Sequence, residues 1–94
     1  MRKYEIVYII DSALGEDVVK ALVEKFTAFF ENNAQIEKVE EWGKKRFAYP
    51  ISKKFEGYYV HMDILAAPEF PLELERQFKI TEGILKYLVI NKED

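Results

Sequence analysis

The sequence contains no cysteine, one histidine, three prolines and four glycines in 94 residues. Without cysteine, the chain can form no disulfide bond, no thiolate metal site and no cysteine nucleophile. His61 has no second histidine with which to share a metal ion, so we predict neither a metal site nor a cofactor. The four glycines stand alone, which excludes a glycine-rich phosphate-binding loop.

Long apolar segments are also absent, since no run approaches the ~20 residues that a membrane-spanning helix needs. The sequence opens without a basic and then apolar leader, so we expect a cytoplasmic protein with no membrane contact. Hydrophobic residues make up 49% and charged residues 33% of the chain, a balance typical of globular proteins. The length predicts one domain over residues 1–94 with a single core.

The chain is acidic, with a net charge of -3. Proteins that bind nucleic acid without a partner are usually basic. Residues 41–60 depart from this balance and combine five basic side chains with six large aromatic rings. Cations beside flat rings suit contacts with phosphates and bases, or with another protein chain. The alternative is a twisted hairpin whose rings pack inward and whose lysines keep it soluble.

Six segments have the periodicity of regular secondary structure. Apolar residues at helical spacing predict one helix over residues 18–33 and a second that starts near Pro71. A turn at Pro50 separates the two strands of a predicted hairpin, and a bulge is expected at Gly43. Continuous or alternating apolar residues predict four strands, over residues 4–10, 35–49, 52–66 and 84–90.

The order strand, helix, strand, strand, helix, strand predicts an α+β protein with the ferredoxin-like βαββαβ fold. Right-handed crossovers then place both helices on one face of a four-stranded antiparallel sheet, with the first and third strands at its centre. The other face is left open, and an apolar surface of that size is typical of an interface. The residues expected on it are Val7, Ile9, Tyr59, His61, Leu65, Leu88 and Ile90.

Catalytic chemistry finds little support in the chain. His61 has only Glu5 and Asp63 as expected neighbours and no nucleophile, so we interpret it as a structural or interface residue. Acyl phosphatases share this fold but need an arginine in the loop after the first strand, and residues 11–15 contain none. Aromatic RNA-binding sheets also share it, but Tyr59 and His61 lack the glycines of that motif.

The run WGKKRFAYPI at residues 42–51, followed by Gly57-Tyr58-Tyr59, closely resembles the bacterial ribosomal protein S-six family. The first five residues and residues 84–89 are also similar to that family, so the resemblance covers nearly the whole chain. Phe47 stands where leucine is usual in the family, and Lys86 stands where arginine is usual.

The resemblance implies a structural protein of the small ribosomal subunit, located on the cytoplasmic ribosome and without enzymatic activity. Family members bind the central domain of the small-subunit ribosomal RNA as a heterodimer with ribosomal protein S-eighteen. A basic partner would supply the phosphate contacts that an acidic chain lacks, and we expect the isolated chain to be a monomer. The alternative is a ferredoxin-like regulatory or ligand-binding module.

Two sets of side chains are candidates for these contacts. For RNA we predict one patch at strand ends, with Arg2, Lys3, Lys86 and Lys92, and one in the hairpin, with Lys44, Lys45, Arg46, Lys53 and Lys54. For the protein partner we predict Trp42, Phe47 and Tyr49 on the second strand, which is a sheet edge, and Tyr59 and His61 on the open face.

Overall fold

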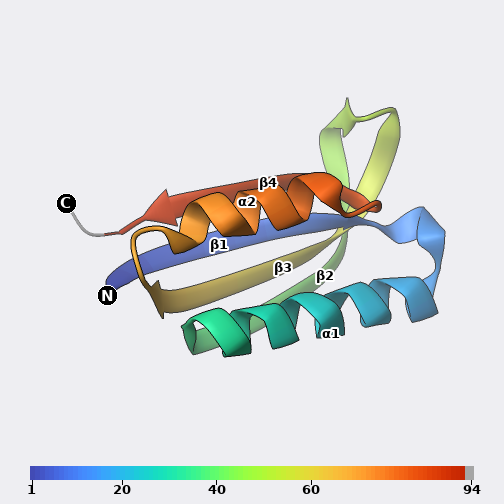
Figure 1. Ribbon diagram of the computed structural model, residues 1–94. Helices are drawn as coiled ribbons and strands as arrows, with labels where there is room; N and C mark the ends of the chain where they lie inside the picture. The colour runs from blue at the N-terminus through green and yellow to red at the C-terminus, as the bar shows by residue number, and fades with distance from the viewer. Residues whose placement is uncertain (93–94) are drawn as a thin grey trace.

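A four-stranded antiparallel sheet carries both helices on one of its faces (Figure 1). The computed structural model describes residues 1–92. Its elements are β1 (Arg2–Asp11), a short 3-10 turn (Ser12–Leu14), α1 (Glu16–Asn33), β2 (Gln35–Ile51), β3 (Lys54–Ala66), α2 (Phe70–Ile80) and β4 (Ile84–Asn91). The strand order β2-β3-β1-β4 places β1 and β3 at the centre, which confirms the predicted ferredoxin-like arrangement. No helix within residues 1–92 is long and apolar enough to cross a bilayer.

The core fills the layer between the sheet and the two helices. Successive residues of a strand point to opposite faces, so every second residue of the central strands faces the helices. An aromatic cluster holds the middle of this layer, where the ring of Phe26 lies 5.4 Å from that of Tyr8 and 4.8 Å from that of Phe78. The strand residues with 0% exposure are Ile6, Tyr8, Ile10, Val60, Met62, Ile64 and Ala66.

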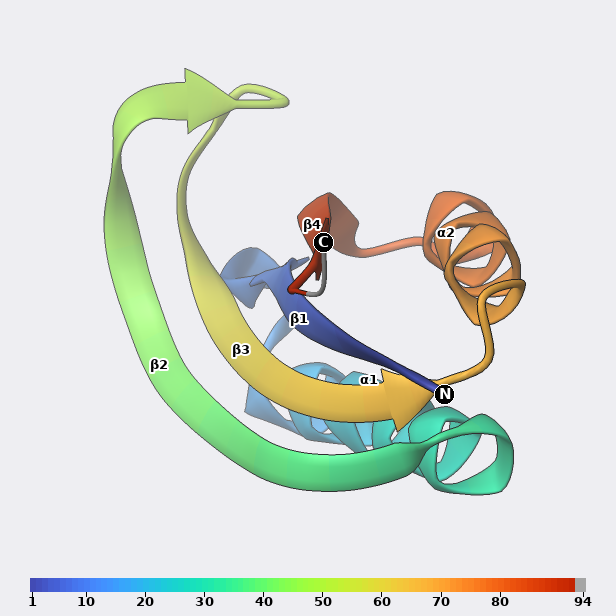
Figure 2. The ribbon, with the colours of Figure 1, turned by 90° about the vertical axis from the view of Figure 1, so that its left-hand side faces the viewer.

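The hairpin of β2 and β3 is long, and Figure 2 shows β2 curling around the outside of the sheet. Its pairing with β3 shifts register between Ile36 and Lys38 and again between Glu41 and Gly43. Gly43 has a φ of 83°, a left-handed conformation that suits glycine, so the bulge predicted there is confirmed. Such bulges bend a strand and increase its twist, which accounts for the curl.

The predicted turn at Pro50 is wrong, because Pro50 lies within β2 and the turn consists of Ser52 and Lys53. Both have positive φ, 49° and 63°, as a two-residue type I′ turn between Ile51 and Lys54 requires. Proline is tolerated in β2 because its position falls in an irregular stretch of the ladder. Gly57 lies inside β3, where a Cβ atom would be 2.5 Å from Cγ2 of Ile9.

Leu72 and Leu74 lie on α2 in opposite environments, 74% and 0% exposed. Leu74→Ala should lower the free energy of unfolding by about 2–5 kcal/mol, because it removes apolar contacts and leaves a cavity. The matched change Leu72→Ala should lower it by less than about 0.5 kcal/mol. Urea titration of both variants measures the difference, and equal losses would contradict the packing of α2 on the sheet.

Candidate interaction surfaces

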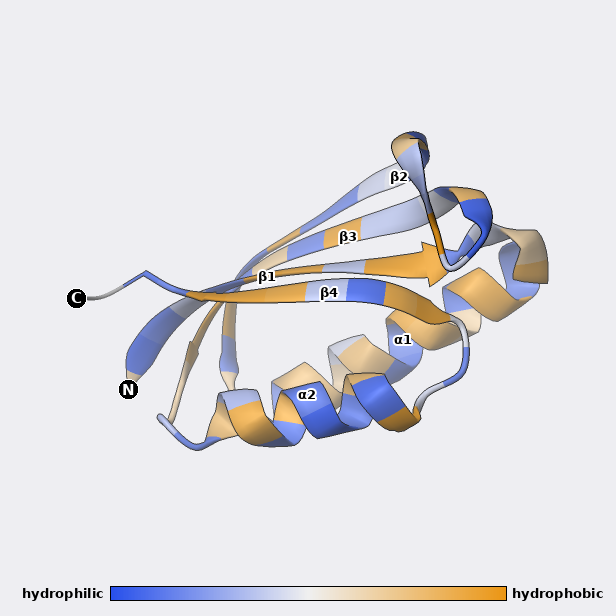
Figure 3. Ribbon diagram, turned by 90° about the horizontal axis from the view of Figure 1, so that it is seen from above, coloured by the Kyte–Doolittle hydropathy of each residue, from blue (hydrophilic) through white to orange (hydrophobic). Residues whose placement is uncertain are grey.

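The sheet face turned away from the helices is uncovered, and Figure 3 shows long apolar stretches along β1 and β4. The strand register brings the expected residues of this face together. Val7 pairs with His61 on one side and with Leu88 on the other, and Ile9 pairs in the same way with Tyr59 and Lys86. Leu88 is 50% exposed, whereas Ile9 and His61 are only 6% exposed, so this face is open along β4 and covered by neighbouring side chains toward the hairpin.

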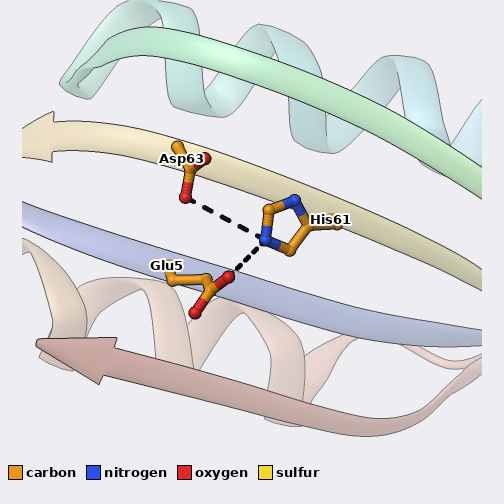
Figure 4. Close-up of side chains that lie close together, drawn as sticks. All are labelled: Glu5, His61 and Asp63. Carbon is orange, nitrogen blue, oxygen red and sulfur yellow. Dashed lines mark hydrogen bonds and ion pairs between the residues drawn. The ribbon is translucent and has the colours of Figure 1, made fainter. Parts of the chain in front are cut away.

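A histidine and three carboxylates meet near the middle of this face. The Nε2 atom of His61 lies 2.6 Å from Glu5 and 3.9 Å from Asp63, as Figure 4 shows, and the Nδ1 atom lies 3.6 Å from Glu40. The register produces this arrangement, since Glu5 pairs with Asp63 across β1 and β3 and Glu40 pairs with His61 across β2 and β3. We refer to Glu5, Glu40, His61 and Asp63 as the histidine–carboxylate cluster.

The hydrogen bond with His61 lowers the pKa of Glu5 below its usual value of 4.5. Partial burial of the carboxylate opposes this shift, and the positive charge of Lys92 adds to it. The Lys92 ammonium also lies 3.8 Å from Asp63. The cluster therefore favours the ionised form of Glu5.

Three ligand atoms of the cluster, one each from Glu5, His61 and Asp63, lie within 4.8 Å of one another and could reach one cation. Protein zinc sites of the structural class use four nitrogen or sulfur ligands, and catalytic sites keep three protein ligands. Here Glu5 is already hydrogen-bonded to His61, and the Lys92 ammonium competes for Asp63. Sequence reasoning expected Glu5 and Asp63 beside His61 but considered only a second histidine or cysteine as a metal-binding partner.

An aromatic row runs from the cluster toward the hairpin, formed by Trp42, Phe47 and Tyr59. The Trp42 ring stacks on His61 with centroids 5.0 Å apart and an interplanar angle of 8°. Tyr59 lies 6.4 Å from Trp42 and 6.1 Å from Phe47. The structure thus brings four of the five predicted partner residues together, whereas Tyr49, 82% exposed, lies outside the row.

The hairpin cations lie near the other end of this row. Lys44 pairs with Glu56 at 3.2 Å, and the Lys45 ammonium lies 5.4 Å from the Trp42 ring centroid. Lys53 occupies the turn itself. Lys54 pairs with Asp11 at 3.2 Å, and together with Arg46 these two residues line a cavity of about 300 Å³.

The strand-end cations divide between the two ends of the sheet. The Lys92 amide donates to the carbonyl of Lys3 at 3.0 Å, and Arg2 precedes Lys3 on β1. Lys86 pairs with Ile9 at the opposite end of β1, nearer the hairpin. The predicted neighbourhood of Arg2, Lys3 and Lys92 is therefore confirmed, and so is the separate position of Lys86.

Residues 3–91 match the family described as Ribosomal protein S6. This chain belongs to the ribosomal protein S6 family. Small ribosomal subunit protein bS6 of Clostridium novyi (strain NT) is 45% identical over 94 residues, which are 99% of each chain. The bS6 protein of Caldanaerobacter subterraneus subsp. tengcongensis is 44% identical over the full length of both chains. The crystal structure of 30S ribosomal protein S6 from Thermotoga maritima is 30% identical and superimposes with a TM-score of 0.91, covering 97% of this chain and 87% of that one.

Membership of the S6 family confirms the resemblance inferred from the hairpin run and the two chain ends. The chain is a structural constituent of the small ribosomal subunit, a component of the cytoplasmic ribosome rather than an enzyme. We therefore interpret the surfaces described above as contacts with other molecules of the small ribosomal subunit.

Glu5→Gln should reduce the loss of stability in acid. Because the folded-state pKa of Glu5 lies below 4.5, its ionised form stabilises the fold at neutral pH, and this contribution disappears as the pH falls below 4.5. The wild type should therefore lose more unfolding free energy than Glu5→Gln between about pH 6 and about pH 3. The difference should be small, because the Glu5 side chain is 32% exposed and solvent screens the interaction.

Urea titrations at a series of pH values measure this difference. Glu31→Gln, an exposed carboxylate on α1, is the matched control and should follow the wild-type curve. Parallel curves for the wild type and Glu5→Gln would show that the bond to His61 does not stabilise the fold.

Proposed function

We propose that this S6-family chain binds the central domain of the small-subunit ribosomal RNA as a heterodimer with ribosomal protein S-eighteen. The observation that carries the proposal is the separation of charge over the surface. Cations gather on the hairpin, whereas carboxylates gather on the uncovered sheet face. RNA phosphates and a basic protein need opposite surfaces, and this chain offers one of each.

The hairpin is the stronger of the two RNA candidates. Its five cations fall within residues 44–54, and Phe55, 62% exposed, lines the same cavity as Arg46 and Lys54. Exposed aromatic rings beside cations suit stacked bases and phosphates. The ion pair of Lys44 is partly exposed, so it is worth little and can be exchanged for a phosphate contact. Lys54 is paired with the buried Asp11 and is less free to exchange.

The strand-end patch supplies a smaller second contact in this proposal. Arg2 and Lys3 are exposed and lie beside Lys92. Lys92 is within 3.8 Å of Asp63, so part of its charge is already balanced. Lys86 lies apart from the other three, closer to the hairpin, and extends the basic surface at that end.

The partner contacts follow from the edge strand and the aromatic row. β2 has no neighbour on its outer side, so its backbone can pair with a strand of another chain. Trp42, Phe47 and Tyr59 supply large rings next to that edge, and aromatic anchors usually carry much of an interface's energy. Tyr49, well exposed on β2, extends the same edge toward the turn.

Binding to RNA should depend on the partner. With a net charge of -3, the isolated chain neutralises few phosphates and releases few counterions, so its affinity for RNA should be low. A basic partner adds phosphate contacts, and the coupling between the two binding events should be about 1–3 kcal/mol or more. Calorimetric titration of a central-domain RNA fragment with the chain, with S-eighteen and with both proteins measures it. Tight binding by the chain alone would contradict the proposal.

Phe47→Glu should abolish the heterodimer while the fold survives. Phe47 packs against Tyr59 outside the main core, so a charge there lies at the surface and meets the partner's apolar side chains. Titration with S-eighteen should show at least about a hundredfold loss of affinity, the range of a hot-spot residue. Leu72→Glu on the helix side is the control and should bind normally. An unfolded Phe47→Glu protein, or one with unchanged affinity, would overturn the role of Phe47.

A further inference from the structure

The histidine–carboxylate cluster holds more hydrogen-bond acceptors than donors. Three carboxylates surround one imidazole, and two ammonium groups lie beside them, Lys38 at 3.2 Å from Glu40 and Lys92 at 3.8 Å from Asp63. Ionised carboxylates only accept hydrogen bonds, and each can accept several. The cluster therefore has spare capacity for a cationic donor.

Two buried atoms of the cluster lack a hydrogen bond within residues 1–92, Oδ1 of Asp63 and Nδ1 of His61. His61 is only 6% exposed, and its Nδ1 faces Glu40 at 3.6 Å, outside hydrogen-bond range. Nζ of Lys92 and Nε2 of His61 lie 3.8 and 3.9 Å from Oδ1 of Asp63, outside hydrogen-bond range. Buried polar atoms are almost always paired, so these atoms point to a group that the isolated chain does not contain.

We propose that the cluster receives an arginine side chain of the heterodimer partner. The inference rests on the proposed function and names the chemistry of one of its contacts. A guanidinium is planar, always charged and carries five N–H donors, so it can bridge two carboxylates. Glu5 and Asp63 pair across neighbouring strands on the same face, as Figure 4 shows, which is the spacing that such a bridge needs.

The surroundings favour a protein side chain over RNA. Three carboxylates repel phosphate, so this part of the face is a poor surface for nucleic acid. Apolar side chains adjoin the cluster, with Ile90 paired to Glu5 and Leu88 paired to Val7. A partner that covers them excludes water, and charge-assisted hydrogen bonds are stronger in such a dry setting.

Isothermal titration with S-eighteen tests the inference on the wild type and on the isosteric variants Glu5→Gln and Asp63→Asn. Each variant should bind roughly tenfold more weakly or worse, because it removes a charge-assisted contact. The controls Glu31→Gln and Asp17→Asn remove the same charges from α1 and should stay within about twofold of the wild type. Circular dichroism and thermal melts establish that each variant is folded.

A double-mutant cycle identifies the donor. Each arginine of S-eighteen is replaced by lysine in turn and titrated against the wild type and Asp63→Asn. For one arginine the two losses should be strongly non-additive, because both changes remove the same contact.

Trp42 is the only tryptophan of the chain and stacks on His61, so its fluorescence should change on binding in the wild type.

The outcomes are distinguishable. If the wild type does not bind S-eighteen, the proposed heterodimer is wrong and this inference with it. If the wild type binds and folded Glu5→Gln and Asp63→Asn bind equally well, the inference alone is overturned.

Titration is repeated with EDTA and with Zn²⁺ alone. The arginine assignment is overturned, and the cluster is a metal site, if two results are found together. Partner binding is lost in EDTA, and Zn²⁺ quenches the fluorescence of Trp42 in the wild type only.

Discussion

The uncovered face of the sheet is the constraint on which the rest of this structure depends. Both helices pack on one face, where alternate residues of β1 and β3 form the dry core. Residues 1–92 form no third layer over the opposite face, which must tolerate water and still offer a surface for another molecule. Mixed composition meets both demands, with apolar Val7 and Leu88 beside charged Glu5 and Asp63.

The histidine–carboxylate cluster contributes little to folding stability by this reasoning. Its carboxylates are between one-quarter and two-fifths exposed, and partly exposed ion pairs are typically worth less than about 1 kcal/mol. What such a cluster provides is specificity, because carboxylates with spare acceptor capacity oppose any occupant that cannot donate hydrogen bonds. The flat contact of Trp42 on His61 fixes the imidazole and so fixes where the acceptors point.

Periodicity predicted the fold and the neighbours Glu5 and Asp63 of His61 but not its third carboxylate, Glu40, for a physical reason. Alternation in β3 reports which face a residue occupies, so the open-face position of His61 was predictable. Contact between His61 and Glu40 depends on a strand register that two bulges in β2 reset, and periodicity does not encode it. The turn was misplaced because Ser52 and Lys53 adopt positive φ without the glycine or asparagine that usually marks such a turn.

Charge separation resolves the apparent conflict between an acidic chain and a place in a ribonucleoprotein. Net charge governs long-range attraction, but at ~0.15 M salt the Debye length is about 8 Å, so short-range contacts depend on the local patch. The hairpin extends beyond the rest of the sheet, as Figure 2 shows, and its turn carries Lys53 and Lys54 beyond the residues that pair with His61. An acidic chain can thus present a basic surface to RNA, provided that its acidic face is turned toward a basic protein.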